Sequence, residues 1–158
     1  MRSSGEAGRG IIGTFMSSPA LFERDWGMTL PLWTLLVAGV LPYVWATVGS
    51  LYRKREFGSI DNSHPRLQQA QQTGPGARAH AASQNAFEVL GVYAPAVLVA
   101  HLLAPGSELS AKLVLGWVVF RVAHGVLYIA NQASARSVCF GLANVCIVLL
   151  YLVAAHLL

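Results

Sequence analysis

The stretch Arg121-Val122-Ala123-His124-Gly125-Val126-Leu127-Tyr128 decides how this chain folds, because it places a polar stripe inside an apolar run. On an α-helix, spacings of three and seven residues bring Arg121, His124 and Tyr128 within about 60° of one another. An arginine at bilayer depth costs roughly 2.5–3.5 kcal/mol even on the lenient insertion scale. Such a residue is kept where it faces the inside of a bundle. The stretch therefore predicts a membrane helix with a polar inward face.

The composition of the whole chain is that of a membrane protein. Charged residues make up 11% of it and hydrophobic residues 54%, whereas soluble domains have roughly 25% charged residues. Lipid offers the backbone no hydrogen bonds, so apolar runs of ~20 residues predict helices that cross the bilayer. We expect one all-α, integral membrane four-helix bundle over residues 26–158. Its spans are expected at about 26–52, 78–104, 109–133 and 136–158.

Residues 1–25 mix Gly, Ser, Arg, Glu and Asp and predict a flexible or interfacial tail, with Met28 as an alternative start. Pro42 and Pro95 fall inside the first two spans and predict kinks there. Cys139 and Cys146 lie seven residues apart in an apolar run, without metal-type spacing. We interpret them as small core residues and expect no metal site.

Basic residues near the spans predict how the protein is oriented in the membrane. Arg53, Lys54, Arg55 and Arg66 follow the first span, and short loops rich in Lys and Arg stay in the cytoplasm. The 53–78 loop is therefore expected on the cytoplasmic side of a multi-pass protein. Four spans then return both termini to the opposite side. For a bacterial chain the membrane would be the cell inner membrane.

A second polar group lies in the helix expected over 78–104. Glu88 lies about ten residues into it, or ~15 Å along the axis. Arg121 lies about as deep in the next helix, so the two predict a Glu88–Arg121 pair. Burying such a pair is at best neutral for stability. The pair alone therefore leaves two roles open, fixing the helix register or belonging to a site.

Arg136 and Ser137 are expected at the start of the fourth helix, where free N–H groups and the positive dipole end favour an anion. A serine there is often only a helix cap, and an arginine a headgroup anchor. Tyr128 lies about two turns earlier, near the same surface. Together with the basic loop, these residues predict a cationic pocket at the cytoplasmic end of the bundle. It suits a small polyanionic ligand whose reactive part points toward lipid.

Three ordered segments carry a family resemblance. The pattern Arg78-x3-Ala82-x2-Asn85-x2-Glu88 resembles the E-R-x3-A-x2-N-x2-[DE] signature of the membrane-associated proteins in eicosanoid and glutathione metabolism (MAPEG). The segments RVAHGVLY and RSVCF, and the basic KREF, are similar to those of its microsomal prostaglandin E synthase and glutathione transferase branch. The resemblance covers about Leu30 to Leu158. It implies a homotrimer of four-helix subunits with glutathione between neighbours.

The resemblance also implies roles for individual residues. Arg121 matches an arginine that pairs with the acid of the second helix, and Arg136 one that stabilises the glutathione thiolate. A guanidinium stays charged and lowers the pKa of a nearby thiol from ~8.5. Ser137 would donate a hydrogen bond to the same sulfur, which makes Arg136 and Ser137 the expected catalytic pair. The expected glutathione-binding residues are Asn85, Glu88, His124, Tyr128, Arg55 and Arg78, and Arg136 and Ser137 also match glutathione-contacting positions.

Other positions depart from the family pattern. Ala77 replaces the leading glutamate, Ala81 and Gln84 stand where basic residues are expected, and Phe140 stands where a tyrosine is common. Two lost cationic contacts weaken tripeptide binding by several kcal/mol. His80 either compensates for them or is an exposed interfacial residue. Glutathione is therefore expected to bind weakly, to bind differently, or to be replaced by another ligand.

Three functions follow from these residues. The first is a glutathione-dependent membrane enzyme, of the transferase, peroxidase or isomerase type, acting on a lipophilic electrophile from the bilayer. The second is a non-catalytic trimeric membrane protein of the same fold that binds lipid or another small anion. A small transporter is the weakest, because the sequence shows no inverted repeat and no pair of broken helices. The expected partners are copies of the chain, membrane lipid and a lipophilic small molecule, without nucleic acid.

Overall fold

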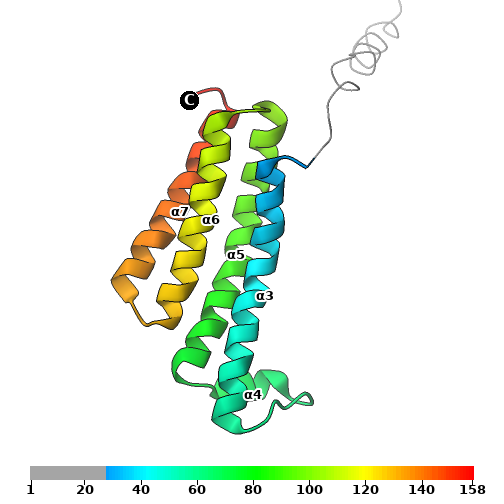
Figure 1. Ribbon diagram of the computed structural model, residues 1–158, viewed down its shortest axis with the longest axis vertical. Helices are drawn as coiled ribbons and strands as arrows, with labels where there is room; N and C mark the ends of the chain where they lie inside the picture. Colours follow the sequence, from blue (N-terminus) through cyan, green and yellow to red (C-terminus); the bar gives the residue numbers. More distant parts are fainter. Residues whose placement is uncertain (1–27) are drawn as a thin grey trace, which may run out of the picture.

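The computed structural model describes residues 28–158, and within them the chain forms helices and no strand (Figure 1). Four of the helices are long and apolar enough to cross a membrane. The predicted all-α architecture with four spans is confirmed. The expected tail and the start of the first span, residues 1–27, lie outside the described residues. The helices are α3 (Leu30–Phe57), α4 (Pro65–Gln71), α5 (Gly74–Leu103), α6 (Glu108–Ile129) and α7 (Ala133–Ala154).

The long helices run side by side but differ in length. The helices α3 and α5 have 28 and 30 residues, whereas α6 and α7 have 22 each. At 1.5 Å per residue, the longer pair spans roughly 45 Å and the shorter pair roughly 33 Å. Figure 1 shows α3 and α5 extending past the α6–α7 connection at the end where α4 lies. The basic segment 53–55 is part of this helical extension.

Helix boundaries depart from the expected spans by a few residues, and the start of α6 is set by a capping serine. The N–H of Ser110 donates to the Ser107 side chain at the start of α6. Pro42 and Pro95 both lie inside continuous helices. The Pro42 carbonyl accepts a hydrogen bond of 2.8 Å from the Ser83 hydroxyl. That contact fastens α3 to α5 at the position of the proline.

The larger apolar core fills the half of the bundle away from α4. The rings of Tyr93 and Trp117 stack with centroids 3.4 Å apart. The Tyr93 hydroxyl lies 2.6 Å from the Thr34 hydroxyl, so the two polar groups satisfy each other. Both Trp117 and Tyr93 are buried, together with Cys146. The prediction of a core role for Cys146 is confirmed, while Cys139 is half-buried.

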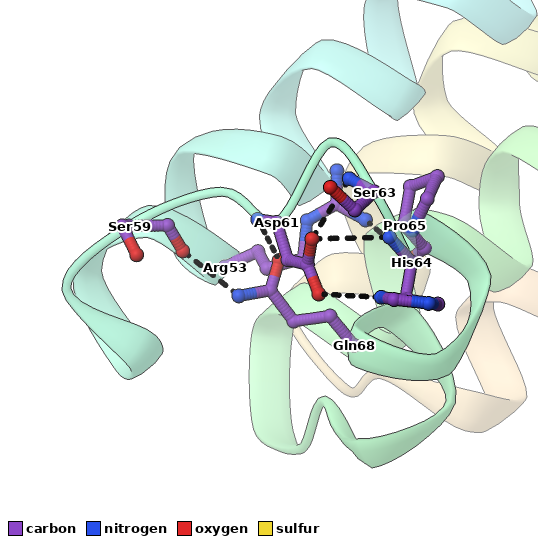
Figure 2. Close-up of polar contacts among 7 residues, drawn as sticks. All are labelled: Arg53, Ser59, Asp61, Ser63, His64, Pro65 and Gln68. Carbon is purple, nitrogen blue, oxygen red and sulfur yellow. Dashed lines mark hydrogen bonds and ion pairs between the residues drawn. The ribbon is translucent and has the colours of Figure 1, made fainter.

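The segment between α3 and α5 is folded onto the end of α3, and the apolar pattern did not predict its short helix. Figure 2 shows Asp61 accepting hydrogen bonds from the backbone N–H groups of Ser63 and His64, at 2.8 and 3.0 Å. The Gln68 side chain bridges back to the carbonyl of Ser59. Arg53 donates to the Pro65 carbonyl at 3.4 Å and is buried. Arg53 therefore braces α4, whereas Lys54 and Arg55 are exposed.

Candidate functional site

A cleft of about 390 Å³ opens between α5, α6 and α7, close to the α6–α7 connection. Its volume falls in the range of small-molecule sites. The sequence pointed to every lining residue, either as a ligand-contacting position or as a departure from the family pattern. The lining residues are Ala81, Gln84, Asn85, Glu88, His124, Tyr128, Arg136, Ser137 and Phe140.

The α6–α7 connection is what brings Tyr128 and Arg136 together. The N–H of Gln132 donates to the carbonyl of Leu127, and the N–H of Asn131 to that of Tyr128. Asn131 has φ of 62°, in the left-handed region that asparagine tolerates better than most residues. These two hydrogen bonds and the left-handed residue form a Schellman motif, which ends α6 and reverses the chain. An asparagine directly after an apolar helix was the sequence signal for this turn.

Arg136 lies over the ring of Tyr128, with its guanidinium carbon 4.1 Å from the ring centroid. The side chain is half-buried in the cleft. A cation on an aromatic face is attracted by the ring quadrupole, more strongly where water is excluded. The contact holds the guanidinium in place while leaving its N–H groups available to a ligand. Tyr128 is therefore a positioning residue for Arg136.

The fourth helix begins three residues earlier than the expected Arg136. The N–H of Arg136 donates to the carbonyl of Gln132 at 3.0 Å and is not one of the free groups of a helix start. The Ser137 hydroxyl donates to the carbonyl of Ala133 at 3.0 Å. The expectation that free backbone N–H groups at these two residues attract an anion is wrong. The Arg136 side chain is therefore the positive group at this end of the cleft, and the Ser137 hydroxyl is already used by the Ala133 carbonyl.

Arg121 contacts Asn85 and not the expected Glu88. Its Nη2 donates to the Asn85 Oδ1 at 3.0 Å and to the Asn85 carbonyl at 3.4 Å. The Asn85 amide in turn donates to Glu88 at 3.4 Å. Within residues 28–158, the ion pairs closer than 4 Å join other residues. Asn85 lies one helical turn before Glu88 and faces Arg121, so the expected direct pair is replaced by a relay.

The relay leaves the two charges in different surroundings. Arg121 is 2% exposed, and its Nη1 has no hydrogen-bond partner among the described residues. Glu88 is exposed on α5 and reaches the cleft. A buried guanidinium that has only amide oxygens as partners is poorly compensated. Asn85 therefore has two tasks, since it lines the cleft and solvates the buried charge behind it.

His124 forms the aromatic wall of the cleft. Its ring lies 5.6 Å from that of Tyr128 and 5.9 Å from that of Phe140. Directly behind it, a Cβ on Gly125 would lie only 2.3 Å from the Trp45 ring of α3. At Gly116 the same addition meets an ordinary contact of 3.7 Å, and at Gly91 it meets open space. Gly125 therefore lets α3 approach α6 more closely than a side chain at this position would permit.

Arg55 and Arg78 do not line the cleft. The Nε of Arg78 donates to the carbonyl of Ile129 at 3.0 Å, where it satisfies the C-terminal end of α6. Arg55 is exposed, with its guanidinium 5.8 Å from the Tyr52 ring. His80 is bonded to Gln69 of α4 and also lies outside the cleft. Among the described residues of this chain, Arg136 is therefore the arginine that lines the cleft.

Comparison with models of known protein families gave a match. Residues 30–156 match the family model described as "MAPEG family". No curated protein and no solved structure gave a match.

Proposed function

The chain belongs to the MAPEG family, and on that premise we propose that it is a thiol-dependent enzyme, with glutathione as the thiol that the family implies. The family includes glutathione-dependent enzymes, and the four apolar helices make this chain an integral membrane protein. The proposed reaction is of the transferase, peroxidase or isomerase type on a lipophilic electrophile. Bound glutathione would supply the thiolate nucleophile. The observation that carries the proposal is Arg136, held over Tyr128 in a cleft of adequate volume.

Each residue of the cleft has a task that follows from its contacts. Arg136 would lower the pKa of a bound thiol, because a guanidinium remains protonated and stabilises the adjacent anion. Tyr128 holds the guanidinium over its ring, so that the side chain does not turn toward solvent. Asn85 and Gln84 offer amide hydrogen bonds to the polar part of the ligand. His124 and Phe140 present an aromatic wall that suits an apolar substrate.

A titration with glutathione tests the proposal. Purified protein in detergent should develop the ultraviolet absorbance of a thiolate near neutral pH. Arg136→Ala should abolish it while the helical content is unchanged. Arg66→Ala is the matched control, because it removes an exposed arginine of α4 outside the cleft and should leave the signal intact. If the wild-type protein gives neither a thiolate signal nor turnover with lipophilic electrophiles, the proposed enzymatic function is wrong.

The alternative is a non-catalytic membrane protein of the same fold that binds lipid or another small anion. Ala81 and Gln84 favour it, because they leave uncharged the part of the cleft where the family pattern expects cations. It predicts that a short-chain anionic lipid competes for the cleft and that no thiol does. The same titration, repeated with such a lipid, separates the two functions.

We also propose that the protein is a homotrimer. Gln84 and Glu88 are polar and exposed on a helix of membrane-spanning length, and Gly91 on that helix has open space beside it. Exposure of such groups to hydrocarbon is unfavourable, and a neighbouring subunit would cover them. Cross-linking in native membranes should end at the trimer. A ladder that stops at the dimer or continues beyond three would contradict it.

The basic 53–78 segment is proposed to lie in the cytoplasm, with both ends of the chain on the other side. A cysteine placed at Ser59, in the loop beyond α3, should then be labelled by a membrane-impermeant reagent only after the cells are opened. Labelling in intact cells would show that the protein has the opposite orientation.

A further inference from the structure

We infer that Arg78 is a positioning residue for Arg136, because it fastens the α6–α7 turn to α5 and so keeps the Arg136 guanidinium over the Tyr128 ring. The inference deepens the proposed function and rests on it, since its effect is read on the thiol that Arg136 would activate. Arg78 itself does not line the cleft. Its role follows from the segment that it holds in place.

The C-terminal end of α6 presents four carbonyls that have no partner within the helix. Three of them accept backbone N–H groups of the turn, at 2.9–3.1 Å; they belong to Val126, Leu127 and Tyr128. The fourth, at Ile129, accepts instead from the Nε of Arg78 at 3.0 Å, across 51 residues of the chain. Arg78 therefore completes the hydrogen bonding of this helix end, and its removal would leave the Ile129 carbonyl without that donor.

This hydrogen bond acts next to the ring that carries Arg136. Ile129 directly follows Tyr128, and both side chains pack against a small buried cluster of α3 and α5. The cluster consists of Leu41, Trp45, Ala82 and Ala86. Ala82 is 1% exposed and lies one turn after Arg78, on the same face of α5. The end of α6 is thus fixed against α5 by apolar packing and by the Arg78 hydrogen bond.

The turn passes this restraint on to Arg136. Asn131 has φ of 62°, a conformation that a residue other than glycine keeps only where its surroundings hold it. The N–H of Arg136 donates to the carbonyl of Gln132, so the start of α7 moves with the turn. The guanidinium carbon lies 4.1 Å from the Tyr128 centroid, and the attraction between a cation and a ring is lost beyond about 6 Å. A small displacement of the turn would therefore release the guanidinium.

Three roles for Arg78 predict different measurements. Direct contact with a ligand, in its own subunit or across a subunit boundary, would set the affinity for the ligand. A cap that serves only the helix would set only the stability of the protein. A positioning residue changes the pKa of the bound thiol, because that pKa depends on how closely Arg136 approaches the sulfur.

The experiment loosens the turn in two independent ways. Full-length protein in detergent is saturated with glutathione, and its thiolate absorbance is followed against pH. Arg78→Met removes the donor to Ile129 but keeps a long side chain, whereas Asn131→Ala strains the left-handed position without changing a charge. We expect both to raise the pKa of the bound thiol, so that the absorbance near neutral pH falls about three- to tenfold and returns at higher pH. Arg78→Lys keeps a donor and the charge and should recover most of the signal.

Each variant has a matched control. Arg66→Met removes an exposed arginine of α4 outside the cleft, and Asn131→Gly adopts the left-handed conformation without strain. Both should keep the wild-type titration curve. The double variant Arg78→Met/Asn131→Ala should show less than the product of the two single effects, because both changes act on one turn.

The inference is wrong if Arg78→Met weakens glutathione binding but leaves the pKa of the bound thiol unchanged, since Arg78 would then contact the ligand. It is also wrong if Arg66→Met shifts the titration curve as far, since net charge would explain the effect. Should Arg78→Met not fold, Arg78→Gln, whose shorter side chain displaces the donor, is judged by the same two criteria. A wild-type protein without a thiolate signal refutes the proposed function, and the positioning role with it; a wild-type signal that Arg78 variants leave unchanged refutes the inference alone.

Discussion

The two halves of the bundle use the same helices in opposite ways. In the half away from α4, Tyr93 and Trp117 stack, and the Tyr93 hydroxyl pairs with Thr34, so the polar groups serve the packing. In the cleft half, the same α5 and α6 carry Asn85, Glu88 and His124 around an open volume. Packing there is interrupted in order to leave polar groups accessible. The apolar half therefore stabilises the bundle, whereas the cleft half leaves polar side chains accessible to a ligand.

Arg121 marks the boundary between the halves. It lies four residues, or one turn, after Trp117 on α6 and three residues before His124. Its guanidinium is buried with Asn85 as its partner, so it belongs to the core by burial and to the cleft by its contact. Substitutions in the apolar half should therefore change mainly the stability of the protein, and substitutions in the cleft half should change mainly ligand binding.

The largest effect is expected from Trp117→Ala. Removing this stacked and buried ring should lower the free energy of unfolding by about 3–5 kcal/mol. Thiol binding by the fraction that remains folded should be unchanged, because Trp117 does not line the cleft. The comparison variant is Phe140→Ala, which should cost under ~1 kcal/mol and should alter binding. Denaturant unfolding in detergent measures the first quantity and thiolate titration the second; equal destabilisation by both variants would erase the distinction.

The next effect concerns the partner of Arg121. Asn85→Ala leaves the buried guanidinium without its acceptor and should cost about 2–3 kcal/mol. In a double-mutant cycle with Arg121→Met, the coupling energy should exceed ~1 kcal/mol. The same cycle with Glu88→Gln should give a smaller coupling, because Glu88 reaches Arg121 only through Asn85. A larger coupling energy for Glu88 than for Asn85 would show that Glu88 and Arg121 pair directly in the assembled protein.

A smaller effect is expected from the close approach behind His124. Gly125→Ala should destabilise the protein by about 1–3 kcal/mol, since the new Cβ overlaps the Trp45 ring. Gly116→Ala on the same helix should be neutral or stabilising, because alanine is the better helix former by about 1 kcal/mol and the space is adequate. Thermal unfolding of the two variants checks the sign of the difference. Equal shifts would show that helix propensity, and not packing, decides at both positions.

The smallest effect is expected from Ser137→Ala. The hydroxyl donates to the Ala133 carbonyl, so a hydrogen bond to a sulfur gains only about 1 kcal/mol or less. The thiolate signal should fall by about fivefold at most, far less than for Arg136→Ala. Arg136→Lys should lie between them, because an ammonium lacks the planar fork of a guanidinium. Ser134→Ala, in the same helix outside the cleft, serves as the control, and a loss as large as that of Arg136→Ala would make Ser137 a principal catalytic group.

Much of the candidate site followed from spacing alone. The periodicity of Arg121, His124 and Tyr128 placed them on one face of a helix, and two of the three line the cleft. Equal depth suggested Glu88 as the partner of Arg121, but depth does not give the rotation of one helix against another. Asn85 is rotated toward α6, and only the packing of α5 against α6 reveals it. For the same reason, Arg78 was expected at the ligand and instead caps α6.

By itself, the sequence determined the number of spans, their helical state and the residue types that meet at one end of the bundle. The physical reason is that lipid forces every apolar run of sufficient length into a helix, and helical spacing then assigns faces. Only the tertiary structure decided which polar group satisfies which. The Schellman turn at Asn131 brings Arg136 onto Tyr128, and the contact of Gly125 with Trp45 sets how closely α3 approaches α6. Partner choice of this kind depends on ångström-scale distances between helices, which hydrophobic pattern does not encode.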